Sequence, residues 1–90
     1  MSEVSQTVEI VNRRGLHARA SAKFVTVAAG LEAEILVSKD GSSVTGTSIM
    51  GLMMLGAAIG DSILITAKGD KAEESLATLV DLVETKFGED

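Results

Sequence analysis

The sequence predicts an α+β domain of the open-faced sandwich type, in which a four-stranded antiparallel sheet carries three helices on one face. Segments with two-residue alternation and segments with helical spacing follow one another in the order βαββαβα. A length of 90 residues allows one small core, so we expect residues 1–90 to form a single domain. The chain is 46% hydrophobic and has no cysteine, so this core must stabilise the fold without disulfides.

The first strand and the first helix are predicted from opposite periodicities. Residues 7–11 alternate between polar and apolar side chains, and Val8 and Ile10 share one face, which is typical of a strand. Apolar residues recur at helical spacing from His17 to Ala29. Gly30 follows at the position where glycine commonly ends a helix, so a helix over residues 17–29 is expected.

A hairpin and a short helix are predicted next. Residues 33–37 alternate, residues 39–42 (KDGS) are typical of a tight turn, and residues 43–45 fit a short third strand. Thr47 or Ser48 can then cap a short helix that ends near residue 55, because a hydroxyl oxygen accepts from the unpaired amides of the first turn.

The last strand and the last helix complete the pattern. Residues 62–68 are rich in β-branched side chains and predict the fourth strand. Asp70 and Glu73 have the spacing of a capping box, so we expect the final helix to begin there. Its apolar stripe consists of Leu76, Leu79, Val80, Val83 and Phe87. Two βα units separated by a hairpin are similar to split βαβ topologies.

Composition excludes several classes of function. The net charge of −5 and the presence of only two aromatic residues, Phe24 and Phe87, argue against binding of nucleic acid. The longest apolar stretch, residues 49–59, is too short to span a bilayer, and residues 1–9 do not resemble a signal peptide. With a single histidine and no cysteine, we expect no metal site and no cofactor, and the lack of cysteine fits a cytoplasmic location.

Positive charge gathers around the single histidine. Residues 10–31 contain no acidic side chain, and they hold His17 together with four of the eight basic residues. These four are Arg13, Arg14, Arg19 and Lys23. Solvated arginines without a role are one interpretation, and a surface that attracts anions or acidic partners is the other.

His17 lies where the loop enters the first predicted helix. The backbone amides of Ala18 and Arg19 belong to the first turn, which has no intrahelical partners and carries partial positive charge, so it can bind phosphate. The Arg19 guanidinium can add a charge-assisted hydrogen bond, and Gly15 allows a loop that leaves the imidazole exposed. His17 is therefore a candidate nucleophile for a phosphoryl group, while a plain loop histidine remains the alternative.

The second unusual segment is the methionine-rich short helix. So many apolar side chains in one short helix cannot all face the core, so some must point outward and mark a partner surface. We expect Leu52 and Leu55 to be buried and Ser48 to cap the helix, where a phosphate would also be well placed. The predicted partner surface consists of Ile49, Met50 and Met53.

Two segments together resemble the histidine-containing phosphocarrier (HPr) family of the bacterial phosphotransferase system. Residues 15–20 (GLHARA) are similar to the family's phosphorylation signature, and residues 48–53 (SIMGLM) to the segment around its regulatory serine. The resemblance covers about residues 7–87. Two departures are Ala20, where the family has proline, and Thr47, where a basic residue often stands.

The resemblance implies a carrier, which is not itself a turnover enzyme. Enzyme I, charged by phosphoenolpyruvate, would phosphorylate His17, at Nδ1 by the family's pattern, with Arg19 as stabilising partner. The phosphoryl group would pass to a protein of the IIA type, and an HPr kinase/phosphorylase would modify Ser48. Arg14 and Lys23 would join the partner surface, and the protein would act as a monomer. The acidic ending, residues 87–90, is similar to the family's nitrogen-type branch.

Two other classes of function remain open from the residues alone. A binding or regulatory module would use the positive surface to hold a small anion without covalent chemistry. A structural subunit would form a stable oligomer that buries Ile49, Met50 and Met53.

Overall fold

The computed structural model describes residues 2–89 and confirms the predicted fold class. A four-stranded antiparallel sheet has the order β1-β4-β2-β3. Its strands are β1 (Ser2–Glu9), β2 (Glu34–Lys39), β3 (Ser42–Thr45) and β4 (Ser62–Gly69). The helices are α1 (Ala18–Ala29), α2 (Ile49–Met54) and α3 (Ala72–Glu84), and a single 3-10 turn, η1 (Lys86–Gly88), follows.

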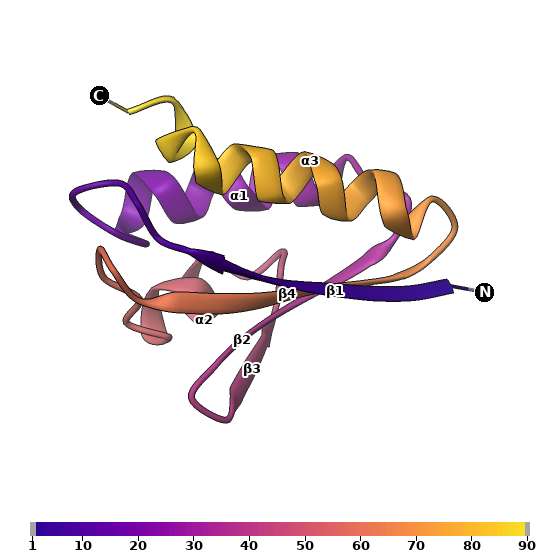
Figure 1. The fold of residues 1–90 in the computed structure, drawn as a ribbon, viewed down its shortest axis with the longest axis horizontal. Coiled ribbons are helices and arrows are strands. Elements are labelled where there is room, and N and C mark those ends of the chain that lie inside the picture. The colour runs from indigo at the N-terminus through magenta and orange to yellow at the C-terminus, as the bar shows by residue number, and fades with distance from the viewer. Residues whose placement is uncertain (1, 90) are drawn as a thin grey trace.

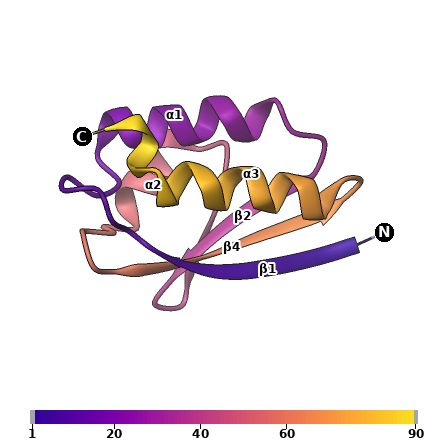
Figure 2. The ribbon, with the colours of Figure 1, turned by 45° about the horizontal axis from the view of Figure 1, so that its top comes forward.

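The two long helices form one layer and the sheet forms the other. α1 and α3 run side by side over the same face of the sheet, as Figures 1 and 2 show from two directions. The short helix α2 contacts α1 and β3. The amide of Leu16, just before α1, donates to the carbonyl of Ala57, just after α2, so the end of α2 lies close to the start of α1. Among the described residues, no helix has both the length and the apolar character that a membrane span needs.

The core lies between the sheet and the helices. In β4 the side chains of Ile63, Ile65 and Ala67 alternate with outward residues and are buried, as the two-residue period of a strand requires. Phe24 of α1 and Leu79 of α3 are fully buried against them. This packing fixes α1, and with it the residues that begin the helix.

The first strand is longer than its sequence pattern predicts. It begins at Ser2, and its partners in β4 run from Ser2 opposite Gly69 to Glu9 opposite Ser62. Residues 2–7 are polar except for Val4, so they lack the apolar alternation that identifies a strand. This part of β1 is therefore stabilised by hydrogen bonding to the neighbouring strand β4 and not by burial of its side chains.

Both ends of the last helix differ from prediction. The capping box prediction was wrong, because the N-cap residue is Lys71 in a left-handed conformation (φ 58°) and no side chain caps the helix. The helix also ends at Glu84, before the predicted Phe87. Phe87 is nevertheless buried, because η1 folds back and places its ring in the core.

Candidate functional site

A loop that is held by hydrogen bonds places His17 at the first turn of α1. His17 is the N-cap residue (φ −73°, ψ 179°), and its side chain makes no capping hydrogen bond. The amide of Leu16 donates to the carbonyl of Ala57 at 2.9 Å, which ties the loop to the segment after α2. Gly15 has φ +64°, and a Cβ atom there would lie 2.4 Å from the Ala57 oxygen, so only glycine fits.

The imidazole of His17 is held by a carboxylate from the far end of the chain. Its Nε2 lies 2.6 Å from Oε2 of Glu89, so Nε2–H donates to the carboxylate. The other carboxylate oxygen accepts from Nδ2 of Asn12 at 3.1 Å, and the same amide group donates to the Gly15 carbonyl at 2.8 Å. One carboxylate thus connects the buried Asn12 with the histidine ring.

This arrangement leaves one ring nitrogen without a partner. Within residues 2–89, Nδ1 of His17 makes no hydrogen bond. The His17 side chain is 15% exposed and that of Glu89 is 20% exposed. The predicted exposed imidazole is therefore half-buried, because the C-terminal segment covers part of it.

The site keeps Glu89 ionised. The hydrogen bond from His17 is the main cause that lowers the pKa of the Glu89 carboxyl, and desolvation opposes it. The hydrogen bond from Asn12 and the positive charge of Arg14 lower this pKa further. Glu89 is accordingly an acceptor at neutral pH.

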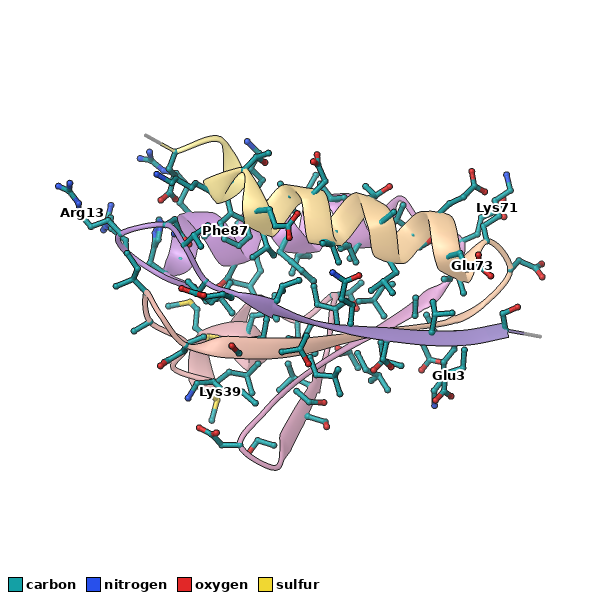
Figure 3. All side chains as sticks on the ribbon, in the orientation of Figure 1. Glu3, Arg13, Lys39, Lys71, Glu73 and Phe87 are labelled. Atoms are coloured by element: carbon teal, nitrogen blue, oxygen red, sulfur yellow. The ribbon has the colours of Figure 1, made fainter. Side chains whose placement is uncertain are left out.

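The C-terminal segment is anchored so that Glu89 reaches α1. The ring of Phe87 is buried below the segment, as Figure 3 shows, and Lys23 Nζ donates to the Phe87 carbonyl at 2.9 Å. Lys86, Phe87 and Gly88 have φ of 62°, 55° and 78°, so the backbone turns through three consecutive left-handed residues. Two of these residues are not glycine, and a left-handed conformation costs free energy at such residues.

Arginines surround the ring. A hollow of about 360 Å³ is lined by Arg13, Arg14, His17, Arg19 and Glu89. Arg13 projects outward from the loop between β1 and α1, as Figure 3 shows. Arg14 and Arg19 are also exposed, and within residues 2–89 neither forms an ion pair at 4.0 Å or less. Arg19 also borders a neighbouring hollow of about 380 Å³ with Lys23 and Glu89.

The chemistry available here is nucleophilic and suited to anions. An imidazole nitrogen lies at a helix start, where the amides of Ala18 and Arg19 have no intrahelical partners, and guanidinium groups are close by. The described residues contain no cluster of three or more side chains that could hold a metal ion. The geometry therefore favours covalent attachment or binding of a phosphate-like group.

The second predicted region lies on α2, next to α1. Ser48 is the N-cap residue, and its Oγ accepts from the Gly51 amide at 3.0 Å, which confirms the predicted cap. Leu52 is fully buried and Leu55 is half-buried against the core, as expected. The exposed apolar side chains of α2 are the predicted Ile49, Met50 and Met53 and also Met54, which was not part of the predicted partner surface.

The structure brings some of the predicted site residues together and separates others. Arg14, His17 and Arg19 line one hollow. Lys23, predicted to face partners, is exposed and borders the neighbouring hollow, and its Nζ donates to the Phe87 carbonyl. Ser48 caps the adjacent helix α2 and does not line this hollow.

Sequence reasoning missed Asn12 and Glu89. Neither has a spacing relative to His17 that marks it as a site residue, since Glu89 is 72 positions away along the chain. The one available signal was charge, because the acidic C-terminal end complements the basic segment of residues 10–31.

Comparisons with known proteins show which family and which fold this chain resembles. The model of the PTS-HPr family, described as "PTS HPr component phosphorylation site", matches residues 4–85. The phosphocarrier protein HPr of Neisseria meningitidis is 46% identical over 86 residues, which cover 96% of this chain and 97% of that protein. The phosphocarrier protein NPr of Escherichia coli is 40% identical over 88 residues, covering 97% and 98%. A crystal structure of HPr from Thermoanaerobacter tengcongensis superposes with a TM-score of 0.90 at 48% identity, covering 100% and 99%.

Proposed function

Because this chain belongs to the PTS-HPr family of phosphocarrier proteins, we propose that His17 is the residue that carries the phosphoryl group and that Nδ1 is the bonded atom. The observation that supports Nδ1 is the 2.6 Å contact between Nε2 and the Glu89 carboxylate. With the ring proton on Nε2, the lone pair is on Nδ1, at the start of α1.

Enzyme I, charged by phosphoenolpyruvate, is the proposed donor, and a protein of the IIA type is the proposed acceptor. In the first step Nδ1 attacks phosphorus, the N–P bond forms, and the bond to the donor group breaks with its electron pair returning to the donor. The second step reverses these roles, with the acceptor as nucleophile. The protein is a covalent carrier between two partners, and they supply the rest of the reaction site.

Positive groups at the helix start stabilise the transferred phosphoryl group. The amides of Ala18 and Arg19 and the exposed guanidinium of Arg19 are suited to its oxygens. Arg14 lines the same hollow and adds positive charge. These groups bind the charge without forming bonds to phosphorus, which keeps the transfer reversible.

Ser48 is the proposed site of regulation by an HPr kinase/phosphorylase. It is half-buried at the N-terminus of α2, directly before the exposed Ile49 and Met50. A phosphate there would add negative charge beside the proposed docking surface of Ile49, Met50 and Met53. Acidic partners would then approach against like charge, and docking would weaken.

The proposed setting is the cytoplasm, with the protein acting as a monomer. The apolar side chains on α2 are then available to successive partners, and methionine suits such reuse because it adapts its shape. A stable oligomer that buries this surface would contradict the proposal, and sedimentation over a range of concentrations would detect it.

Transfer of label from phosphoenolpyruvate tests the central claim. With enzyme I and labelled phosphoenolpyruvate, the wild-type chain should gain one acid-labile phosphate, and His17→Ala should gain none. The chain has a single histidine, so a phosphohistidine can form nowhere else. Acid-stable label, or label that persists in His17→Ala, would contradict a phosphohistidine carrier.

Replacement of the serine tests the regulatory claim separately. Ser48→Asp keeps a capping oxygen and adds a negative charge, so it should slow transfer to His17 while the fold stays intact. Ser48→Asn keeps a capping side chain without the charge and serves as the control. Equal transfer rates in these two variants would remove the proposed role of charge at Ser48.

A further inference from the structure

We propose that Glu89 is a positioning residue for the transfer reaction, which rests on the proposed role of His17. Its carboxylate accepts a hydrogen bond from Nε2–H, and this contact selects the ring tautomer whose lone pair is on Nδ1. The same contact holds the proton on Nε2 after Nδ1 is phosphorylated. The ring is then a better leaving group when the phosphoryl group moves on.

The geometry of the contact supports this role. The distance of 2.6 Å between Nε2 and Oε2 is short, as expected for a hydrogen bond to a charged acceptor. Both side chains are mostly shielded from water, at 15% and 20% exposure, so the contact is stronger than a fully solvated pair. A carboxylate that orients an imidazole through one nitrogen leaves the other nitrogen to react.

A carboxylate is the side chain that satisfies both neighbouring donors. Its two oxygens accept from His17 Nε2–H and from Asn12 Nδ2 at the same time. A glutamine has one carbonyl oxygen, so its NH₂ group would face one of these two donors. Asn12 cannot turn to compensate without losing its bond to the Gly15 carbonyl at 2.8 Å.

The backbone conformation that places the Glu89 carboxylate is unfavourable in free energy. Lys86 and Phe87 adopt left-handed angles, and Gly88 approaches Lys23 so closely that a Cβ atom there would lie 2.9 Å from Nζ. The buried Phe87 ring and the Lys23 hydrogen bond to its carbonyl over-determine this turn. Strained backbone held in place by its surroundings is common at functional sites.

Other charged groups face the carboxylate and could compete for it. Arg13 and Arg14 from the loop and Arg19 from α1 line the same hollow, and Lys23 borders the adjacent one. Within residues 2–89, none of these cations pairs with the Glu89 carboxylate at 4.0 Å or less, whereas Nε2 of His17 lies 2.6 Å from its Oε2. The arginines therefore remain available for the phosphoryl oxygens.

No proton has to move in either transfer step. The form of the ring that attacks phosphorus is neutral, with hydrogen on Nε2 and a lone pair on Nδ1. Forming the N–P bond makes the ring formally cationic, and the carboxylate stabilises this charge. When the bond to phosphorus breaks, its electron pair returns to Nδ1 and the ring is neutral again with Nε2–H unchanged.

The test compares Glu89→Ala and Glu89→Gln with Glu84→Gln, an exposed glutamate at the end of α3. Ring ¹⁵N chemical shifts of His17, recorded with the imidazole neutral, report the tautomer directly. We expect Nε2–H to dominate in the wild-type protein and in Glu84→Gln. Glu89→Ala should shift the ring towards a mixture of tautomers, and Glu89→Gln should lie between.

Transfer kinetics provide the second readout. Transfer from phosphorylated His17 to an acceptor should slow by about tenfold in Glu89→Ala, the lower end of the effect seen when the hydrogen-bond partner of a metal-binding histidine is removed. Glu84→Gln should transfer at the wild-type rate. Backbone amide spectra of the variants should match the wild type, because Glu89 lies at the end of the chain.

The outcomes separate this inference from the proposed function. Normal phosphorylation of His17 with an unchanged tautomer in Glu89→Ala would overturn the role of Glu89 alone. Faster transfer in Glu89→Ala would also overturn it and show that the C-terminal segment shields the ring. A wild-type protein that gains no phosphate on His17 would contradict the proposed function and the transfer role of Glu89 together.

Discussion

Single residues decide the shape of the loop that presents His17. Gly15 combines a left-handed φ of +64° with a contact distance that leaves no room for a side chain. Gly41 also has a left-handed φ, +84°, but no atom within 4 Å of an added Cβ. A substitution at Gly41 would therefore introduce backbone strain alone, whereas one at Gly15 would introduce backbone strain and a steric clash.

Replacing these two glycines by alanine should have unequal effects. Gly41→Ala should lower the free energy of unfolding by about 1 kcal/mol, the cost of a left-handed alanine. Gly15→Ala should lower it by roughly 3 kcal/mol, because the loop must also move away from Ala57. Urea unfolding measures both, and equal losses would show that the close approach of Gly15 to Ala57 has no energetic importance.

Ionisation of Glu89 adds a pH dependence at the residue scale. Its pKa in the folded protein is lowered, so the contribution of Glu89 to stability is complete above its ordinary value of 4.5. This contribution is lost as the pH falls through the lowered folded pKa, because the unfolded chain binds the proton first. Glu89→Gln should therefore destabilise the protein at pH 7 and have much less effect near pH 2.

Unfolding by urea at both pH values checks this sign. Glu84→Gln is the control, and its stability should follow that of the wild type at both pH values. A Glu89→Gln effect that is equal at pH 7 and pH 2 would contradict the claim that the ionised carboxylate stabilises the C-terminal segment.

At the scale of elements, the stability of α2 depends on its N-cap more than on the length of the helix. It has six residues, and isolated helices of this size do not form in water. The Oγ of Ser48 satisfies the Gly51 amide, and Leu52 inserts into the core. One hydrogen bond and one buried side chain therefore contribute much of what holds the proposed docking surface in place.

Removal of this cap should destabilise the protein measurably. Ser48→Ala should lower the free energy of unfolding by about 1 kcal/mol, whereas Ser48→Asp should stay closer to wild type because aspartate is also a good cap. Thr47→Ala, one residue earlier and exposed, is the matched control. Thermal unfolding of the three variants checks the order, and an equal loss in Thr47→Ala would contradict the capping role.

Elements with a buried face were the ones that the sequence predicted well. Ile65 in β4 and Phe24 in α1 are fully buried, and each lies on an apolar face of its element. The spacing of apolar residues along the sequence indicates such buried faces. The start of β1 at Ser2 and the N-cap at Lys71 were missed, because strand pairing and a left-handed turn leave no apolar period. Local sequence contained no information on these two features.

At the scale of the whole molecule, the candidate site combines what could and could not be predicted. His17, Arg19 and the helix start are close in sequence, so their proximity follows from one loop and one helix. Glu89 reaches the same place only because α3 packs beside α1 and Phe87 folds back into the core. Contacts between distant parts of the chain depend on tertiary packing, which a local motif does not report.

The distribution of charge over the molecule gives the last prediction. The protein is acidic overall, at −5, yet the end that presents His17 has Arg13, Arg14 and Arg19 at its surface. A local positive field steers acidic partners towards the ring and is screened by salt. Arg14→Ala should therefore lower the rate of association with an acidic phosphodonor by several-fold at low ionic strength, on the scale of steering effects.

This loss should shrink as salt is added, because screening removes the same attraction in the wild-type protein. Lys68→Ala is the matched control, since Lys68 is an exposed cation on β4 that lies outside this hollow and only pairs loosely with Glu3 at 3.7 Å. Both variants remove one positive charge, so net charge alone predicts equal effects on association. Stopped-flow measurements over a range of ionic strength distinguish the two: a larger and salt-sensitive effect of Arg14→Ala supports local steering at the His17 end, and equal effects would attribute association to net charge.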